Sequence, residues 1–165
     1  MSEDLRAAAS AVLDACRSRG LKVATAESCT GGLVAGALTE IAGSSDVVDR
    51  GFVTYSNEAK QQMLGVPAAT IDTHGAVSRE TAEAMARGAI GFANADLAVA
   101  ITGIAGPGGG GPGKPVGLVH FAAAARSGAL THAEMRYGDI GRSAVRRQSV
   151  LQALAMLNEL AEKSG

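Results

Sequence analysis

The sequence predicts an α/β fold, a three-layer α/β/α sandwich on a five-stranded mixed sheet. Short apolar runs typical of strands alternate with segments of helical periodicity. Aromatic residues make up only 3% of the 165 residues and Trp is absent. The core is therefore expected to consist of Ala, Val, Leu and Ile packed around many glycines, which favours layered α/β packing. The length fits a single domain over residues 1–165.

The first part of the chain predicts a helix, a strand and a second helix. Apolar residues recur at helical spacing over residues 3–19, and Gly20 follows as a stop signal. An apolar strand is expected over residues 22–27. The next helix carries the apolar residues between 33 and 41 and is expected to end at Gly43.

The middle of the chain predicts a second strand, over residues 50–55. Ser56 is expected to cap a short helix after it. Residues 65–77 have no clear period and are expected to form a loop. Ser78 is expected to cap a further helix that ends at about Phe92.

The remaining elements complete the sheet. Residues 97–101 form a continuous apolar run, as expected for a central strand covered on both faces. The Gly-rich segment 106–115 holds no regular element and is expected to be a loop over a site. Strands over 116–125 and 130–137 are expected to form an antiparallel hairpin, with the second, alternating strand at an edge. A last helix is expected over 142–163.

Charge and composition argue against several classes of partner. The formal net charge is −1, and the only basic cluster is Arg142, Arg146 and Arg147, whereas nucleic-acid binding needs a clustered excess of basic residues. No apolar stretch of about 18 residues is present, so no spanning helix is expected. Cys16 and Cys29 are too few for a disulfide scaffold. With an acidic start to the chain, these features predict a cytoplasmic protein without membrane or nucleic-acid partners.

The most informative stretch is residues 23–32, an apolar run that stops at polar residues and opens into a helix. This pattern predicts a strand-to-helix turn that presents Ser28. Gly31 and Gly32 would let the backbone approach a ligand, and the amides around residues 30–32 would hold an anion or an oxyanion. Acyl transfer and phosphate binding are about equally supported here. In a third interpretation, Ser28 or Thr30 merely caps the helix.

Further polar residues are expected at the same edge of the sheet. The carboxyl ends of parallel strands meet at one rim, which would bring together Ser28, Tyr55, Lys60 and the Thr102-Gly103 pair. A partly buried lysine beside a hydroxyl loses proton affinity and can accept the proton of a nucleophile, so Lys60 is the candidate base. Tyr55 is expected to relay a proton or to stack on a ring.

Other residues offer alternative chemistry. His74 lies in the expected loop and is a second candidate base, whereas His120 and His132 lie in strands and show no metal-ligand spacing. No metal or other cofactor is therefore expected. Cys29 is a rival nucleophile, although a small buried cysteine behind the turn is the more common role.

The Gly-rich segment 106–115 does not match a P-loop, because Lys114 is followed by Pro115. Its glycines could still let backbone amides reach a phosphate. Arg142, at the start of the last helix, could add a charge-assisted hydrogen bond to the same phosphate.

Four motifs occur in this order along the chain: Ala26-Glu27-Ser28-Cys29-Thr30-Gly31-Gly32, Tyr55-Ser56-Asn57-Glu58-Ala59-Lys60, His74-Gly75-Ala76-Val77-Ser78 and Thr102-Gly103-Ile104-Ala105-Gly106-Pro107. Together they resemble a known family, the CinA carboxy-terminal domain family, over roughly residues 5–160. Characterised members of that family are nicotinamide-nucleotide amidohydrolases.

The resemblance implies a three-layer sandwich on a five-stranded mixed sheet. It also implies roles for particular positions: Ser28 matches the serine nucleophile, and Tyr55 and Lys60 match the residues that assist it. Thr102 and Arg142 match positions associated with the substrate. The function expected on this basis is deamidation of nicotinamide mononucleotide to nicotinate mononucleotide and ammonia.

Two other classes of function remain open at this point. One is a nucleotide- or phosphate-binding module without catalysis. The other is a regulatory domain linked to competence or DNA damage, for which the edge strand 130–137 would offer an interaction surface. A homodimer is expected because the outer helices carry many apolar Ala and Leu residues.

Overall fold

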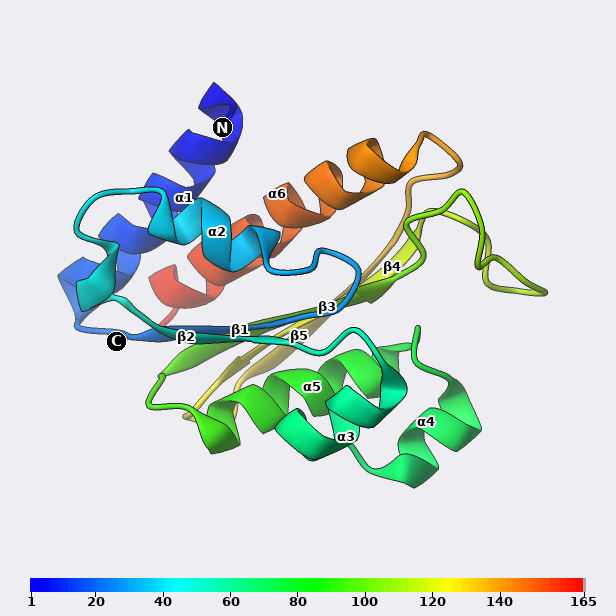
Figure 1. Cartoon of the computed structure of the whole chain (residues 1–165). Coiled ribbons are helices and arrows are strands. Elements are labelled where there is room, and N and C mark those ends of the chain that lie inside the picture. The colour runs from blue at the N-terminus through cyan, green and yellow to red at the C-terminus, as the bar shows by residue number, and fades with distance from the viewer. Residues whose placement is uncertain (165) are drawn as a thin grey trace.

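A mixed sheet with helices on both faces forms the described part of the chain, residues 1–164, in this computed structural model (Figure 1). Helices α1, α2 and α6 cover one face, and α3, α4 and α5 cover the other. The elements are α1 (Glu3–Arg19), β1 (Val23–Glu27), α2 (Leu33–Thr39), the 3-10 turn η1 (Ser44–Asp46), β2 (Val48–Val53), α3 (Asn57–Leu64), α4 (Ala68–His74), α5 (Arg79–Phe92), β3 (Leu97–Gly103), β4 (Leu118–Ala125), β5 (Leu130–Arg136) and α6 (Arg142–Glu162).

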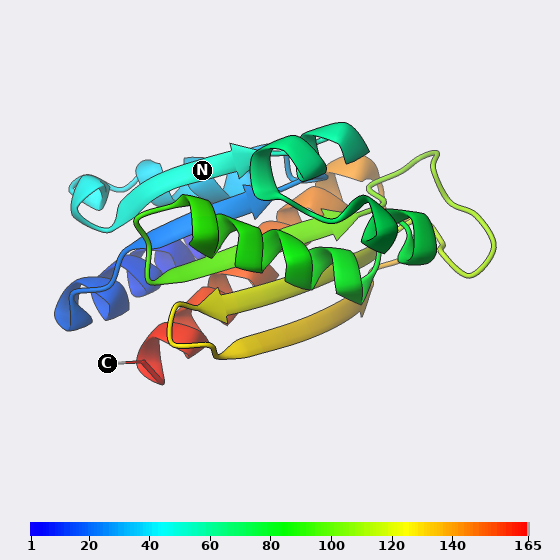
Figure 2. The same cartoon turned by 90° about the horizontal axis from the view of Figure 1, so that it is seen from below.

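The strand order is β2-β1-β3-β4-β5 (Figure 2). Strand β1 runs parallel to both β2 and β3, whereas β3, β4 and β5 are antiparallel neighbours. The predicted five-stranded mixed sheet, the hairpin and the edge position of β5 are confirmed. The chain leaves β1 through α2 on one face and returns from β2 through α3 to α5 on the other face. The carboxyl ends of β1 and β3 therefore flank the switch point where such sheets bind ligands.

The two faces of the sheet carry side chains of different size. Successive residues of a strand point to opposite faces, so Val99 and Ile101 pack against α1, α2 and α6. Ala98 and Ala100 pack against α5 and its neighbours. The alanine face extends over the central strands, and α5 lies over it (Figure 2).

The expected loop over residues 65–77 is wrong in part, because it contains helix α4, Ala68–His74. This helix is only seven residues long, and Ile71 is its one buried residue, so it produces no readable period. Its boundaries do carry signals: Pro67 stands immediately before it and Gly75 ends it. Strand β2 also begins and ends two residues before the expected strand 50–55.

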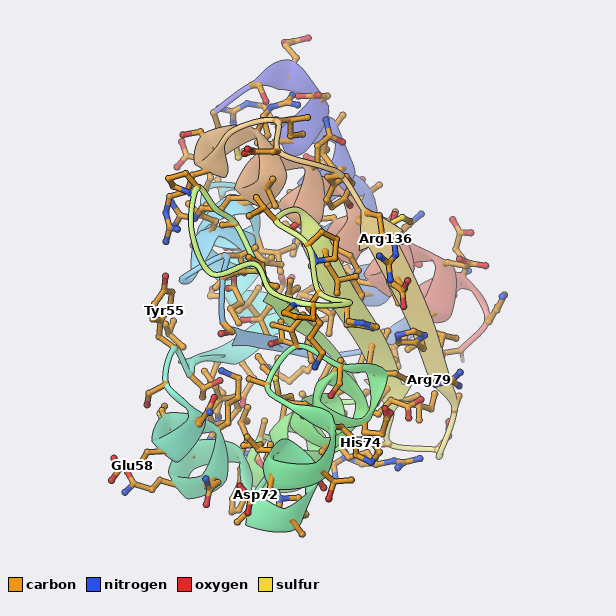
Figure 3. The ribbon with its side chains drawn as sticks, turned by 90° about the vertical axis from the view of Figure 1, so that its right-hand side faces the viewer. Tyr55, Glu58, Asp72, His74, Arg79 and Arg136 are labelled. Carbon is orange, nitrogen blue, oxygen red and sulfur yellow. The ribbon has the colours of Figure 1, made fainter. Side chains whose placement is uncertain are left out.

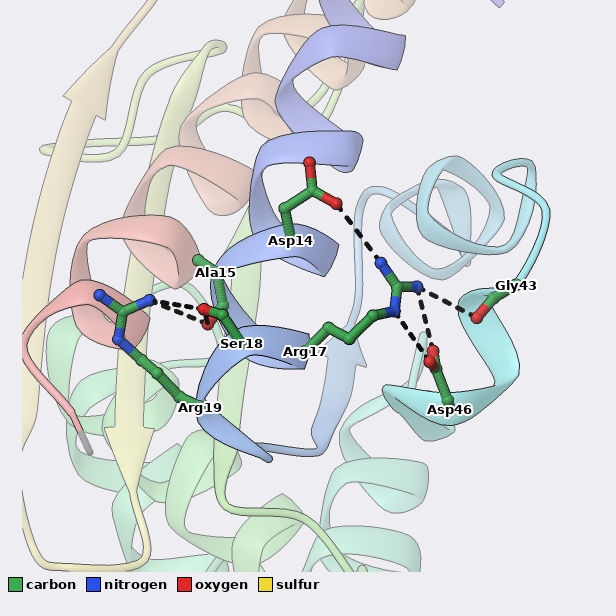
Figure 4. Close-up of polar contacts among 7 residues, drawn as sticks. All are labelled: Asp14, Ala15, Arg17, Ser18, Arg19, Gly43 and Asp46. Carbon is green, nitrogen blue, oxygen red and sulfur yellow. Dashed lines mark hydrogen bonds and ion pairs between the residues drawn. The ribbon is translucent and has the colours of Figure 1, made fainter.

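An arginine on the outer surface ties α1 to the connection that leads into β2 (Figure 4). Arg17 Nε donates to Asp46 Oδ2 at 2.8 Å, and its Nη2 donates to Gly43 O at 3.2 Å. This pairing lowers the pKa of the Asp46 carboxyl. Exposed ion pairs of this kind contribute little free energy, so its effect is mainly to fix the path of the chain.

The Gly-rich loop between β3 and β4 extends beyond the carboxyl end of β3 (Figure 2). Two side-chain hydrogen bonds connect this loop to the rest of the protein. Lys114 Nζ donates to the main-chain oxygen of His74 at 2.6 Å, and Arg142 Nη1 donates to that of Gly106 at 2.8 Å. The second of these bonds involves Arg142, a residue of the predicted site.

Both cysteines, Cys16 and Cys29, are buried and free. None of the helices in residues 1–164 combines the length and the apolar character needed to cross a membrane.

Candidate active site

A small pocket of about 190 Å³ opens at the carboxyl ends of β1 and β3. Larger hollows lie elsewhere on the surface of the described residues, among them ones of about 630, 580 and 460 Å³. The small pocket is distinguished by its chemistry, because it holds a hydroxyl, an amine and a guanidinium together. Six of the nine predicted site residues line it: Ser28, Tyr55, Lys60, Thr102, Gly103 and Arg142.

Ser28 and Lys60 meet at the base of this pocket. Ser28 directly follows β1, and its amide continues the sheet by donating to Ile101 O at 3.0 Å. Lys60 Nζ donates to Ser28 Oγ at 3.0 Å and to Thr54 O at 2.8 Å. Ser28 is 8% exposed and Lys60 only 1%. The two residues predicted as nucleophile and base are therefore in direct hydrogen-bond contact.

Burial shifts Lys60 toward its neutral form. Loss of water around the ammonium lowers the pKa of Lys60. Both hydrogen-bond partners of Nζ are neutral oxygens, so no carboxylate holds the charge in place. An amine in this environment is able to accept a proton from a hydroxyl.

Cys29 is adjacent to the same contact but is not prepared for attack. It is buried, and this burial raises the pKa of its thiol to about 11. The thiolate is the reactive form of cysteine. At neutral pH, Cys29 therefore remains a protonated thiol, which favours Ser28 as the nucleophile.

Tyr55 and Arg142 form the rim of the pocket. Tyr55 is 61% exposed, and Figure 3 shows its side chain standing out from the surface. Its hydroxyl accepts a hydrogen bond from Arg142 Nη2 at 2.7 Å. The expected relay through Tyr55 is not needed for proton transfer, because Lys60 already contacts Ser28 directly.

Thr102 and Gly103, at the end of β3, line the pocket beside Ser28. The hydroxyl of Thr102 donates to Ala76 O at 2.8 Å and thereby fixes the segment between α4 and α5. Gly103 leaves no room for a side chain, since a Cβ there would lie 2.7 Å from Val119 Cγ2. Thr102 thus shapes the pocket through a main-chain contact, and Gly103 lets the end of β3 pack closely against Val119 of β4.

The amides of Val34 and Ala35, in the first turn of α2, are not open to a ligand. Glu27 lies on the face opposite Ser28, beneath α2, and its carboxylate accepts hydrogen bonds from Val34 N at 2.9 Å and Ala35 N at 3.1 Å. Oε1 also accepts from the hydroxyl of Thr30 at 2.7 Å. An internal carboxylate therefore occupies the positive end of this helix.

Thr30, Gly31 and Gly32 accordingly lie outside the pocket. Thr30 is fully buried. The amide of Gly31 donates to Ser28 O at 3.0 Å, which closes the turn. Gly31 and Gly32 both have positive φ, 57° and 102°, a conformation that glycine adopts without strain. The three residues shape the turn that carries Ser28.

The histidines are placed away from Ser28. His74 ends α4 and lines a different groove, with Nδ1 3.5 Å from Glu80 Oε1, so it is not positioned as a base for Ser28. His120 and His132 form a pair that sequence reasoning missed, with Nδ1 and Nε2 3.0 Å apart. In the hairpin register Glu134 lies opposite His120 and Ala122 lies opposite His132, so the two histidines are diagonal neighbours on one face. This register is the signal that would have revealed the pair.

Two further residues of the site carry no strong local signal. Asn57, the first residue of α3, lines the pocket. Arg146 of α6 donates hydrogen bonds to the turn that follows Ser28. Asn57 could have been suggested by its place after the capping Ser56, whereas the contact of Arg146 depends on the packing of α6.

Comparison with known proteins identifies the family. The model of the CinA C-terminal domain matches residues 5–161. The chain belongs to the CinA C-terminal domain family. Among curated members, it is 56% identical over 144 residues to the nicotinamide-nucleotide amidohydrolase PncC of Escherichia coli K12, which covers 87% of this chain and 86% of that protein. A CinA-like protein of Anaeromyxobacter dehalogenans 2CP-C is 54% identical over 140 residues, covering 85% of this chain but 34% of that longer protein.

Solved structures with similar sequences share the fold. The competence/damage inducible protein CihA of Agrobacterium tumefaciens matches with a TM-score of 0.95 and 59% identity, over 97% of both chains. A CinA superfamily protein of Escherichia coli matches with a TM-score of 0.90 and 36% identity, over 97% of this chain and 93% of that one. The predicted family and fold class are thus confirmed.

Proposed function

We propose that the protein hydrolyses the carboxamide of nicotinamide mononucleotide, giving nicotinate mononucleotide and ammonia. The observation that carries the proposal is the buried contact of 3.0 Å between Ser28 Oγ and Lys60 Nζ in a solvent-accessible pocket. The curated name of the PncC relative supports the choice of substrate, since that protein covers most of this chain at 56% identity.

In the first half of the reaction, neutral Lys60 accepts the hydroxyl proton while Ser28 Oγ attacks the carboxamide carbon. A C–O bond forms, and the carbonyl electron pair moves to oxygen. The Lys60 ammonium then gives its proton to the amide nitrogen, the C–N bond breaks and ammonia leaves. An ester between Ser28 and the nicotinoyl group remains.

In the second half, a water molecule gives a proton to Lys60 and attacks the ester carbon. The tetrahedral intermediate collapses, the bond to Ser28 Oγ breaks, and Lys60 returns the proton to the serine. The products are the free acid and the starting state of the enzyme. One water is consumed for each ammonia released.

The oxyanion of both steps requires donors other than the amides of α2. We place it at the main-chain amides of Gly103, in the pocket wall, and of Thr30, for which no acceptor is described among the turn and loop bonds of residues 1–164. Ile104 N bonds to β4, at Leu118 O, 2.9 Å away. Because alternate residues of an antiparallel strand bond to the same neighbour, the amide of Gly103 is directed away from β4, toward the end of β1 and Ser28.

The rim residues are proposed to hold the rest of the nucleotide. A pocket of about 190 Å³ has room for the pyridine ring but not for a whole nucleotide. The ribose and phosphate would therefore extend over the rim, with the ring of Tyr55 beside the pyridine and the Arg142 guanidinium on the phosphate. Asn57 and Thr102 would complete the walls.

The test is ammonia release from nicotinamide mononucleotide, with nicotinate mononucleotide measured as the second product. We expect Ser28→Ala and Lys60→Met to lose activity by several orders of magnitude, since one loses the nucleophile and the other the base. Cys29→Ala is the matched control and should keep activity close to wild type. Full activity in the serine variant, or loss confined to the cysteine variant, would contradict the proposed roles.

The non-catalytic alternative predicts a different outcome in the same experiment. A nucleotide-binding module would bind the mononucleotide in calorimetry and release no ammonia. A regulatory domain would lose a protein partner when β5 is mutated while the pocket is intact. Ammonia release that depends on Ser28 separates catalysis from both.

We further propose that the enzyme is cytoplasmic, acts on a small nucleotide and binds no nucleic acid. The net charge of −1 and the two unpaired cysteines support this. A homodimer is also proposed, and sedimentation at micromolar concentration tests it. A sedimentation coefficient of a monomer at all concentrations would exclude the dimer.

A further inference from the structure

An arginine on the last helix reaches the turn that carries the nucleophile. Arg146 Nε donates to Cys29 O at 3.1 Å, and Nη2 donates to Thr30 O at 3.4 Å. Cys29 and Thr30 are the two residues directly after Ser28. The contact joins segments 117 residues apart in the sequence, so it forms only when α6 is packed in its final place.

A carboxylate also holds this turn, because it accepts hydrogen bonds from N–H and O–H groups of the segment after Ser28. Glu27 accepts from the hydroxyl of Thr30 and from the first amides of α2. Glu27 therefore binds N–H and O–H groups of the segment after Ser28, and Arg146 binds its carbonyl oxygens. Gly31 lies between the two, and a Cβ there would come within 3.3 Å of Arg146 Nη2.

We propose that Arg146, acting together with Glu27, is a positioning residue for the reaction of Ser28. This role rests on the proposed function. Arg146 fixes the main chain after Ser28, so that Ser28 Oγ stays within hydrogen-bond distance of Lys60 Nζ and points into the pocket. Arg146 does not line the pocket and touches no reacting atom. A misplacement of about 1 Å at the reacting centre can cost about a hundredfold in rate, so a contact that only holds the turn can have a large effect.

The neighbouring arginine provides a matched control. Arg147 is the next residue on α6, but it turns to the N-terminal segment, where Nη2 pairs with Asp4 Oδ2 and with Ser2 Oγ. Arg146 and Arg147 thus have the same charge and lie on the same helix. They differ in their contacts, because Arg146 binds the turn after Ser28 and Arg147 binds the N-terminal segment. Arg146→Met and Arg147→Met each remove one guanidinium while keeping a long apolar stem.

The first measurement is steady-state kinetics on nicotinamide mononucleotide. We expect Arg146→Met to lower kcat by about ten- to a hundredfold and to change KM by less than about threefold, because substrate binding residues are untouched. Arg147→Met should retain kcat within about twofold. Arg146→Lys, which keeps one donor group, should recover part of the lost kcat. A kcat for Arg146→Met equal to that of Arg147→Met would overturn the proposal.

The second measurement does not depend on the identity of the substrate. A fluorophosphonate probe forms a bond from Ser28 Oγ to phosphorus, fluoride leaves, and Lys60 takes the proton. We expect labelling of Ser28 to be at least about tenfold slower in Arg146→Met than in Arg147→Met. If wild type is labelled but releases no ammonia from the mononucleotide, the proposed substrate fails while the role of Arg146 is still measured.

Folding is monitored in the same samples by chemical denaturation. If Arg146→Met does not fold, Arg146→Lys decides the question: labelling slower than in Arg147→Met supports the positioning role. Labelling of folded Arg146→Lys and Arg146→Met at the rate of Arg147→Met would overturn it.

Discussion

At the scale of single residues, the site depends on a lysine whose amine is buried and desolvated. Lys60 is almost fully buried, and its Nζ contacts only a serine hydroxyl and a main-chain oxygen. Desolvation disfavours the ammonium, and this lowers the pKa of Lys60 below the ordinary value of 10.5. The same burial that makes the amine a base therefore has a cost in stability whenever the amine is protonated.

This cost predicts how stability changes with pH. Between the shifted pKa of Lys60 and 10.5, the unfolded chain holds a proton on this lysine that the folded protein lacks, so the free energy of unfolding rises with pH in that window. Lys60→Met removes the effect. We expect the variant to be more stable than wild type at pH below the shifted pKa, with a gain that shrinks toward pH 10.5, measured by urea denaturation across pH.

The pH profile of activity reports the same group. Because the neutral amine is the base, kcat/KM should rise with pH through an apparent pKa below 10.5. A stability difference between Lys60→Met and wild type that stays constant across this range, together with a flat rate profile, would contradict the assignment of Lys60.

Some residues of the site are readable from the sequence, and others are not. Ser28 and Lys60 were predictable because each follows a strand that ends at the same rim. Glu27 is one residue before Ser28, so alternation along β1 places it on the opposite face, beneath α2. Its hydrogen bonds to the α2 amides could therefore have been predicted from the sequence. The contact of Arg146 could not have been, because it depends on the packing of α6 rather than on a local pattern.

At the scale of elements, boundaries follow local signals where the element has a buried face of its own. Helix α5 was predicted from Ser78 to Phe92, and Ser78 Oγ does accept from Thr81 N at 3.1 Å. Helix α4 was missed because a single buried residue, Ile71, gives no period. The short elements that shape the pocket are thus harder to predict than the long ones that support it.

The packing of α5 against α3 gives a prediction at this scale. A Cβ on Gly88 would lie 2.0 Å from Leu64 O, the last residue of α3, whereas a Cβ on Gly91 of the same helix meets nothing within 4 Å. Gly88→Ala should lower the free energy of unfolding by about 1–3 kcal/mol or more, through overpacking. Gly91→Ala should raise it by up to about 1 kcal/mol through helix propensity.

Thermal and urea denaturation of the two variants measures this difference. Since α3 carries Lys60, Gly88→Ala should also lower activity on the mononucleotide, and Gly91→Ala should not. Equal stability of the two variants would show that α3 moves away at no cost.

At the scale of the whole molecule, the sheet is most protected at its centre. Strands β1, β3 and β4 are buried along almost their full length, whereas β2 and β5 are partly exposed at the edges. We expect the slowest amide hydrogen exchange in β1, β3 and β4, and faster exchange in β5 and the Gly-rich loop. Hydrogen exchange read by NMR or mass spectrometry tests this order. Protection of β5 equal to that of β3 in the dilute protein would instead indicate that another chain covers the edge.

The overall architecture was the most predictable level, because strand count, parallel crossovers and the hairpin each follow from patterns along the chain. The organisation of residues 1–165 as one domain, the cytoplasmic location and the homodimer stay predictions. The location depends on the cell and the homodimer on surface contacts between two chains, and local sequence patterns place few constraints on either.

The small side chains on the alanine face of the sheet help to set the distance between Ser28 and Lys60. Ser28 extends from the side of the sheet that carries Ala26 and Ala100, and Lys60 comes from a helix stacked over that same side. The gap between nucleophile and base is therefore set by the thinness of the layer between them. A branched side chain at Ala26 or Ala100 would thicken that layer and move Ser28 Oγ away from Lys60 Nζ without altering either residue.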